Sequence, residues 1–237
     1  MPRQSFIIVI ISAVVVFFAT PALFAQQQCR APVSPPNIPE LALQNSQLPT
    51  AVRESIGTPV LVDKYVGDPE GEGAIMVSGH MHTVFATPLQ GFVSAAQDFE
   101  AHPDYLGRVV DAEILCSDNT SYVRTRQELS FRVLGFGSDY EHELHYFITD
   151  EIASRGEFTI LWKLAESLDR KHTDIYGGWF FREITLNGRP HTYVAYKTTS
   201  VFRETQFGLR TALNRFGERD IRNVILDIEA EAARRSR

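Results

Sequence analysis

The sequence has 237 residues, of which 44% are hydrophobic, and a formal net charge of −6. This length and composition suit one domain with a sizeable core together with a leader segment. The mildly acidic balance argues against nucleic acid as a partner, because phosphate binding requires an excess of positive charge.

The first residues have the three-part layout of a secretory signal. Arg3 precedes an apolar stretch at residues 6–18, and small residues then lead to Ala25. We predict that residues 1–25 are a signal peptide cleaved near Ala25, which places the mature protein in the periplasm or outside the cell. The alternative is a retained transmembrane anchor, for which the apolar core is short. Cleavage would change the formal charge from −6 to −7, because this segment holds one arginine and no acidic residue.

Residues 26–72 are predicted to be a proline-rich leader or linker. Prolines and glutamines are frequent at residues 26–50, which is typical of an extended tether that does not pack. Scattered apolar residues at 51–65 are expected to lie against the domain. The two cysteines, Cys29 and Cys116, would meet oxidising conditions outside the cytosol, but the sequence is equally compatible with a disulfide and with two free thiols.

The compact domain is predicted to span residues 73–237. It begins with a strand at 74–85, and a helix follows directly. Thr87 and Gln90 match a capping box at the start of this helix, with a proline at its first position. Apolar residues recur at helical spacing until Phe99, which predicts one buried face.

Six further segments rich in β-branched and aromatic residues are predicted strands. They lie at residues 109–116, 122–134, 140–149, 157–166, 176–185 and 193–202. The connections between them are short, and Asn187-Gly188 is typical of a tight hairpin, so we predict an antiparallel meander. A long helix with one apolar stripe is predicted at residues 205–234.

This order of elements resembles a known superfamily. The residues that carry the resemblance are FATP at 85–88, FEAHPDYL at 99–106, GGWFF at 177–181 and the closing helix. Together they are similar to the START/Bet v 1-like (SRPBCC) superfamily, in particular its polyketide cyclase/dehydrase and coenzyme Q-binding-like members. The resemblance implies an α+β helix-grip fold, in which a curved antiparallel β-sheet wraps around a long C-terminal helix. It also implies a cavity for a lipid, sterol, quinone or polyketide, but it does not imply catalysis.

Alternation along the strands predicts which side chains line this cavity. Charged residues between 124 and 132 share one face, which leaves Thr125 and Gln127 on the inner face. A few polar groups among aromatic walls are typical of a selective apolar site. The predicted ligand-binding residues are Thr125, Gln127, His142, Tyr146, Trp162, Trp179 and Tyr196. The alternative for the first three is a role as hydrogen-bonded core or rim residues.

His80 and His82 alternate on a strand and would share one face, as metal ligands often do. We nevertheless predict no metal site, because the opposite face of this strand is the apolar one, which should direct both histidines toward solvent. No further ligand set accompanies them, and no cofactor is expected. A nucleophile elbow of the Gly-x-Ser-x-Gly type is also missing from the sequence.

The leading hypothesis is therefore an exported binding or carrier protein for a hydrophobic small molecule. The first alternative is a cyclase or dehydratase that uses an inner acid or base such as His142 or Tyr146. The second is an envelope interaction module that is tethered by its leader and holds no ligand. Transient membrane contact through the last helix is a further alternative. The sequence specifies neither the ligand nor the oligomeric state.

Overall fold

The computed structural model describes residues 29, 31–41, 50–69, 73–133, 136–203 and 209–237. The predicted signal peptide lies outside these residues and stays a prediction. Within the described part of the chain, no helix is long and apolar enough to cross a membrane.

Eight strands and five α-helices make up the described chain. The strands are β1 Val60–Gly67, β2 Ile75–Phe85, β3 Val109–Ser117, β4 Tyr122–Val133, β5 Phe136–Glu151, β6 Glu157–Ser167, β7 His172–Leu186 and β8 Arg189–Phe202. The helices are α1 Thr50–Glu54, α2 Leu89–Gln97, α3 His102–Tyr105, α4 Ile152–Arg155 and α5 Leu209–Arg235, with one 3-10 turn at Phe99–Ala101.

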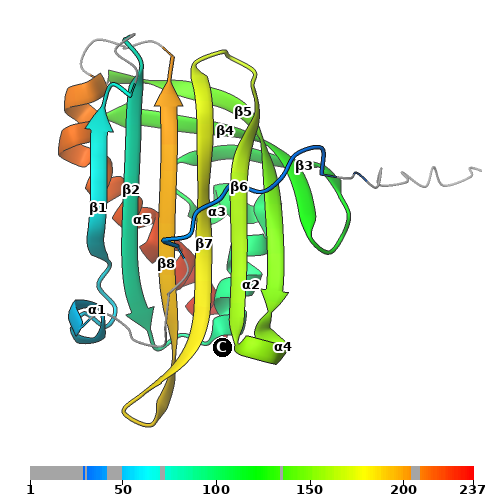
Figure 1. Cartoon of the computed structure of the whole chain (residues 1–237), viewed down its shortest axis with the longest axis vertical. Coiled ribbons are helices and arrows are strands. Elements are labelled where there is room, and N and C mark those ends of the chain that lie inside the picture. Colours follow the sequence, from blue (N-terminus) through cyan, green and yellow to red (C-terminus); the bar gives the residue numbers. More distant parts are fainter. Residues whose placement is uncertain (1–28, 30, 42–49, 70–72, 134–135, 204–208) are drawn as a thin grey trace, which may run out of the picture.

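All eight strands form one antiparallel sheet in the order β1-β2-β8-β7-β6-β5-β4-β3. The sheet is strongly curved, and α2 and α5 lie on its inner face (Figure 1). The predicted α+β helix-grip fold is therefore confirmed. Asn187 and Gly188 both have positive φ, at 51° and 72°, as a tight turn between β7 and β8 requires.

The sheet begins earlier than the boundary predicted at residue 73. β1 pairs antiparallel with β2 and forms one edge of the sheet. The glycine-rich residues after β1, which resemble a break between domains, instead connect two paired strands. β1 was not predicted because it is an edge strand whose side chains are only partly buried, and Val62 is 55% exposed.

The described part of the leader crosses the outer face of the sheet (Figure 1). Ile38 and Leu41 are buried against the aromatic side chains of Phe180 and Tyr193. A Cβ added to Gly178 would lie 2.5 Å from Cδ2 of Leu41, so the leucine occupies a site that only glycine leaves open. The expectation that residues 26–50 do not pack is therefore wrong for the described residues.

Two further contacts fix the leader to the sheet. Cys29 forms a disulfide with Cys116 on β3, with the two Cα atoms 5.7 Å apart. Glu40 pairs with Lys197 on β8. The question that the sequence left open about the two cysteines is thus answered in favour of the disulfide.

On the inner face, α5 packs against both the sheet and α2. A Cβ added to Gly91 of α2 would lie 2.5 Å from the carbonyl oxygen of Ala232, so the two helices touch through their backbones. The predicted capping box is wrong: no side chain caps α2, and the hydroxyl of Thr87 donates a hydrogen bond of 2.8 Å to Glu229 on α5. The start of α2 is therefore tied to α5 by Thr87.

The leader packing predicts a large effect of Leu41→Ala. Removing this side chain, which is 2% exposed, should lower the free energy of unfolding by about 2–4 kcal/mol, since it leaves a cavity against the sheet. Val33→Ala is the matched control, because Val33 is 41% exposed in the same segment, and its effect should stay within about 0.5 kcal/mol. Urea unfolding of both variants measures the difference, and equal effects would contradict the packing of the leader.

Candidate functional site

A cavity of about 250 Å³ lies between the inner face of the sheet and α5. Its walls are mainly apolar side chains from the strands, the α2–α3 segment and α5. Small side chains on β8 help to leave this space, among them Thr198 and Ser200 in the cavity lining. A strongly curved sheet and a straight helix leave such a space unless large side chains fill it.

An aromatic row crosses four adjacent strands of the cavity wall. It consists of Tyr146, Trp162, Trp179 and Tyr196, from β5, β6, β7 and β8. The ring centroids of Trp179 and Tyr196 are 4.2 Å apart, and those of Trp162 and Tyr196 are 5.7 Å apart. Gly177 makes this arrangement possible, because a Cβ there would collide with the Trp162 ring. The row gives the cavity a broad, rigid apolar surface.

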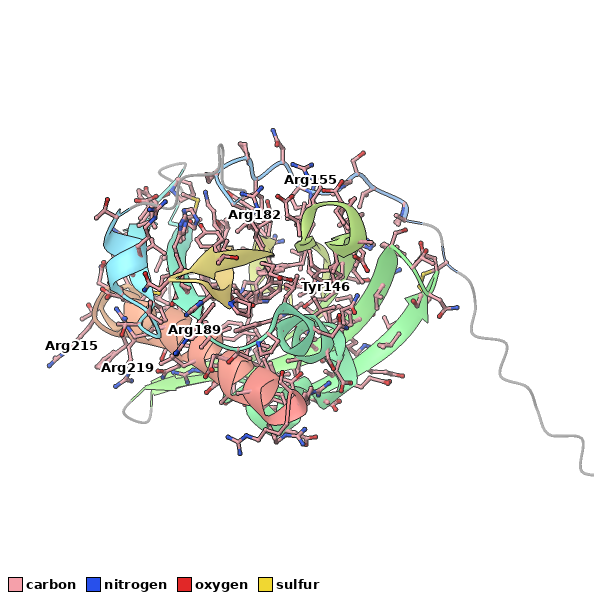
Figure 2. All side chains as sticks on the ribbon, turned by 90° about the horizontal axis from the view of Figure 1, so that it is seen from below. Tyr146, Arg155, Arg182, Arg189, Arg215 and Arg219 are labelled. Carbon is pink, nitrogen blue, oxygen red and sulfur yellow. A yellow bond between two sulfur atoms is a disulfide. The ribbon has the colours of Figure 1, made fainter. Side chains whose placement is uncertain are left out.

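Polar groups in the aromatic row are few and uncharged. The side-chain amide of Gln127 donates a hydrogen bond of 3.1 Å to the hydroxyl of Tyr146. Burial raises the pKa of Tyr146 well above its ordinary value and raises that of Tyr196 to about 12. Both phenols therefore keep their protons at neutral pH. In Figure 2, Tyr146 lies in the interior of the molecule, between the sheet and the layer of α2 and α5.

Two buried histidines line another part of the cavity. His142 on β5 is 1% exposed and His172 on β7 is 4% exposed. Their ring centroids are 5.8 Å apart, with the rings edge-on. Burial lowers the pKa of each to about 4, and for His172 the nearby His142 adds to the effect. Both imidazoles are therefore neutral at neutral pH.

One ion pair also lines the cavity. The guanidinium of Arg108 donates hydrogen bonds of 3.0 Å to both carboxylate oxygens of Asp220. Arg108 also stacks over the ring of Phe131 at 4.6 Å. Because the Arg108 side chain is 29% exposed, this part of the lining reaches the surface. The pair ties α5 to the segment that precedes β3.

The structure brings most of the predicted site residues together. The residues that line the cavity are Gln127, His142, Tyr146, Trp162, Trp179 and Tyr196. Thr125 is fully buried on the same strand as Gln127 but is not part of the lining. Contact of these residues with a ligand stays a prediction.

Sequence reasoning missed His172, Tyr140 and the Arg108–Asp220 pair as lining residues. His172 follows a run of charged residues that is typical of an exposed turn. Tyr140 is a large aromatic residue on β5 whose pattern alone does not distinguish a cavity-lining residue from a core residue. Asp220 belongs to the charged side of α5, which looks fully solvated when the helix is considered alone. Only the pairing of distant elements places these side chains at the cavity.

The prediction that His80 and His82 face solvent is wrong. Both are buried on the outer face, where Leu41 and Val52 share an apolar cluster with Tyr193. Nε2 of His82 lies 2.6 Å from Nε2 of His80, and Nδ1 of His82 lies 2.5 Å from the Tyr193 hydroxyl. Burial lowers the pKa of both histidines, that of His82 to about 4. Among the described residues, no group of three or more side chains is arranged to hold a metal ion.

Comparison with known proteins yields matches in structure alone. No family model and no curated protein matches the sequence. The Zhui aromatase/cyclase from Streptomyces sp. R1128 is 18% identical with a TM-score of 0.52, and the match covers 68% of this chain and 96% of that one. A STAR-related lipid transfer protein from Xanthomonas axonopodis is 12% identical with a TM-score of 0.52, covering 71% and 98%.

The human StAR-related lipid transfer protein 5 is also similar, at 9% identity and a TM-score of 0.52, covering 74% of this chain and 89% of that one. Identities this low show the fold and nothing finer. The chain therefore has a START/SRPBCC-like fold, as the sequence motifs indicated. The site must be argued from its own residues.

The neutral histidines predict that acid destabilises the folded protein. The pKa values of His82, His102, His142 and His172 are about 4 in the folded state, against about 6.5 in an unfolded chain. As the pH falls from about 6.5 to about 4, the unfolded state takes up protons that the folded state does not, so the free energy of unfolding decreases. Above about pH 7 these groups contribute no pH dependence.

Urea unfolding at several pH values measures this slope. The double variant His142→Phe/His172→Phe should show a shallower decline below about pH 6.5, since two of the groups that take up protons are gone. A wild-type stability that stays constant or rises on acidification would contradict the burial of these imidazoles in the neutral form.

Proposed function

We propose that this protein binds and carries a hydrophobic small molecule in the cavity between the sheet and α5. The observation that carries the proposal is an apolar cavity walled by the aromatic row and provided with a few uncharged polar groups. This is the composition expected of a selective site for an apolar ligand. A lipid, sterol, quinone or polyketide-like molecule fits this description. Two of the fold neighbours are named as lipid transfer proteins, which supports a carrier role.

The chemistry of the lining favours binding over catalysis. A general acid or base works best with a pKa near the operating pH. The pKa values of His142 and Tyr146 are shifted away from neutrality in opposite directions, so neither exchanges a proton readily there. Both cysteines belong to the disulfide and cannot act as nucleophiles. One fold neighbour is named as an aromatase/cyclase, but the shifted pKa values give a cyclase or dehydratase less support than a carrier.

The cavity also weighs against an interaction module without a ligand. Such a module would gain stability from a filled interior, because each void forfeits packing contacts. Residues with small side chains instead line this space on β8, at Thr198 and Ser200. A protein that retains this space at a cost in stability is better suited to hold a guest molecule.

We further propose that the protein is exported by its signal peptide. The leader has the layout of a signal peptide, and the Cys29–Cys116 disulfide suits an oxidising compartment. Only three glutamines lie between the proposed cleavage point and Cys29, which would leave the cysteine near the new N-terminus. The disulfide would then hold that end of the mature chain on β3.

The carrier proposal predicts that filling the cavity abolishes uptake. Ser200→Phe places a ring in the space below α5 and should weaken binding of the fluorescent apolar dye N-phenyl-1-naphthylamine at least about 10-fold. Val110→Phe is the control, because Val110 is 53% exposed on β3, and its affinity should stay within about 2-fold of the wild type. Circular dichroism verifies that both variants are folded. A wild-type protein that takes up no dye, and from which organic solvent extracts no lipid, would refute the proposal.

The export proposal predicts the mass and thiol content of the protein made with its own leader. Intact mass spectrometry should find a chain that begins near Gln26 and is lighter by two hydrogens, since the disulfide has formed. Thiol titration should detect no free cysteine in the wild type and one in Cys29→Ser. A mature chain that retains residues 1–25 would contradict cleavage.

A further inference from the structure

His142 and His172 are two of the three buried histidines that line the cavity, and they lie close together in its wall. His172 packs against Tyr140 and Phe202, with ring centroids 4.9 Å and 4.6 Å away. His142 lies on β5, where it pairs with Gln127 on β4, and its ring contacts that of His172. The two imidazoles are therefore held between aromatic rings and adjacent strands. Neither is free to turn out into solvent.

Within the described residues, three nitrogens of this pair have no hydrogen-bond partner. They are Nδ1 and Nε2 of His142 and Nδ1 of His172, and all three are buried. A buried polar group without a partner is costly, and folded proteins rarely keep one. Both histidines belong to the lining of the cavity, so a molecule bound there would lie against their side chains. The pair is thus a candidate subsite for the polar group of a ligand.

The chemistry of neutral imidazoles limits what that polar group can be. Each neutral ring has one N–H that donates and one nitrogen that accepts, so the pair offers both functions. A hydroxyl group also donates and accepts, and it can satisfy both kinds of nitrogen at once. An ether or ketone only accepts, which leaves an acceptor nitrogen without a partner. A hydrocarbon leaves all three nitrogens unpaired.

Charge next to the pair does not favour an anion. Asp169 and Lys171 are close to the two histidines and pair with each other at 3.5 Å. The carboxylate of Asp169 also accepts hydrogen bonds from the backbone N–H groups of Glu141 and Lys171. Elsewhere in the lining, Arg108 is paired with Asp220. Because burial keeps both imidazoles neutral, a carboxylate at this subsite would lack a compensating positive charge.

We infer that His142 and His172 anchor the hydroxyl group of an uncharged, otherwise apolar ligand. This inference rests on the proposed carrier function and adds the ligand class to it, namely apolar alcohols in preference to ethers, ketones and carboxylic acids. An ordered water molecule could satisfy the same nitrogens. In that case alcohols would have no advantage over matched ligands.

Competition binding tests the preference. The full mature chain, stripped of lipid, is loaded with N-phenyl-1-naphthylamine, and the dye is displaced with dodecanol, its methyl ether or dodecanoate near neutral pH. Dodecanol should bind about 10-fold more tightly than the ether, because only the alcohol satisfies donor and acceptor nitrogens together. Dodecanoate should bind no better than the ether. Imidazole nitrogen shifts in an NMR spectrum should respond to dodecanol and not to the ether, which provides a readout that needs no variant.

Two variants test whether His142 and His172 cause the preference for the alcohol over the ether. His142→Phe and His172→Phe keep a ring in place and remove the nitrogens, so each should reduce the preference for the alcohol over the ether to within about 2-fold. The preference is the ratio of the affinities for the two competitors, so a change in the affinity for the dye does not affect it. His102→Phe is the control. His102 also lines the cavity and its Nε2 also lacks a partner, but its ring packs against Phe99 and Tyr105 in the α2–α3 segment, whereas His142 and His172 pack against each other. This variant should keep the full preference.

The outcomes separate this inference from the carrier function. Equal binding of the alcohol and the ether, tighter binding of dodecanoate, or a preference that survives both His142→Phe and His172→Phe would overturn the inference and leave the carrier function standing. A loss of preference in His102→Phe would overturn the assignment to this pair. Failure of the wild type to bind the dye and every competitor would overturn both the carrier function and the inference.

Discussion

The close contact of α5 with the sheet and with α2 determines most of the architecture. A Cβ at Gly79 of β2 would collide with Ile221 of α5, and a Cβ at Gly91 of α2 would collide with the backbone at Ala232. Glycine at these two positions lets α5 come close to two other elements. The middle of α5 approaches β2, and the end of α5 approaches α2. The sheet is strongly curved, and the part of α5 at residues 213–228 lines the cavity opposite it. The cavity is the space that the curved sheet and this helix leave between them.

Part of the outer face of the sheet is buried as well, although an antiparallel sheet with helices on one side can leave its other face to solvent. The leader crosses this face and brings Leu41 against Gly178, and the disulfide of Cys29 fixes its beginning to β3. As a result, His80 and His82 are neutral parts of a hydrogen-bonded chain that ends at Tyr193. The leader is therefore an integral part of the folded domain, and it explains why polar residues on this face are buried.

The polar groups of the cavity share one property, which is the absence of a net charge. The phenols of the aromatic row keep their protons, the imidazoles of His142 and His172 stay neutral, and Arg108 is paired with Asp220. Neutral groups can select a ligand by its hydrogen bonds while they exchange protons poorly. This combination suits recognition of an uncharged molecule better than acid–base chemistry.

The sequence by itself determined seven of the eight described strands, the long last helix and the inner face of the sheet, because period-two and period-3.6 patterns are local properties of the chain. It therefore placed Gln127, His142, Tyr146, Trp162, Trp179 and Tyr196 at the cavity. Only the tertiary structure decided the role of the leader, the Cys29–Cys116 disulfide, the burial of His80 and His82, and the meeting of His172 with His142. These features depend on contacts between residues that are far apart in the chain. A local sequence pattern does not predict which distant segment will pack against a given face of the sheet.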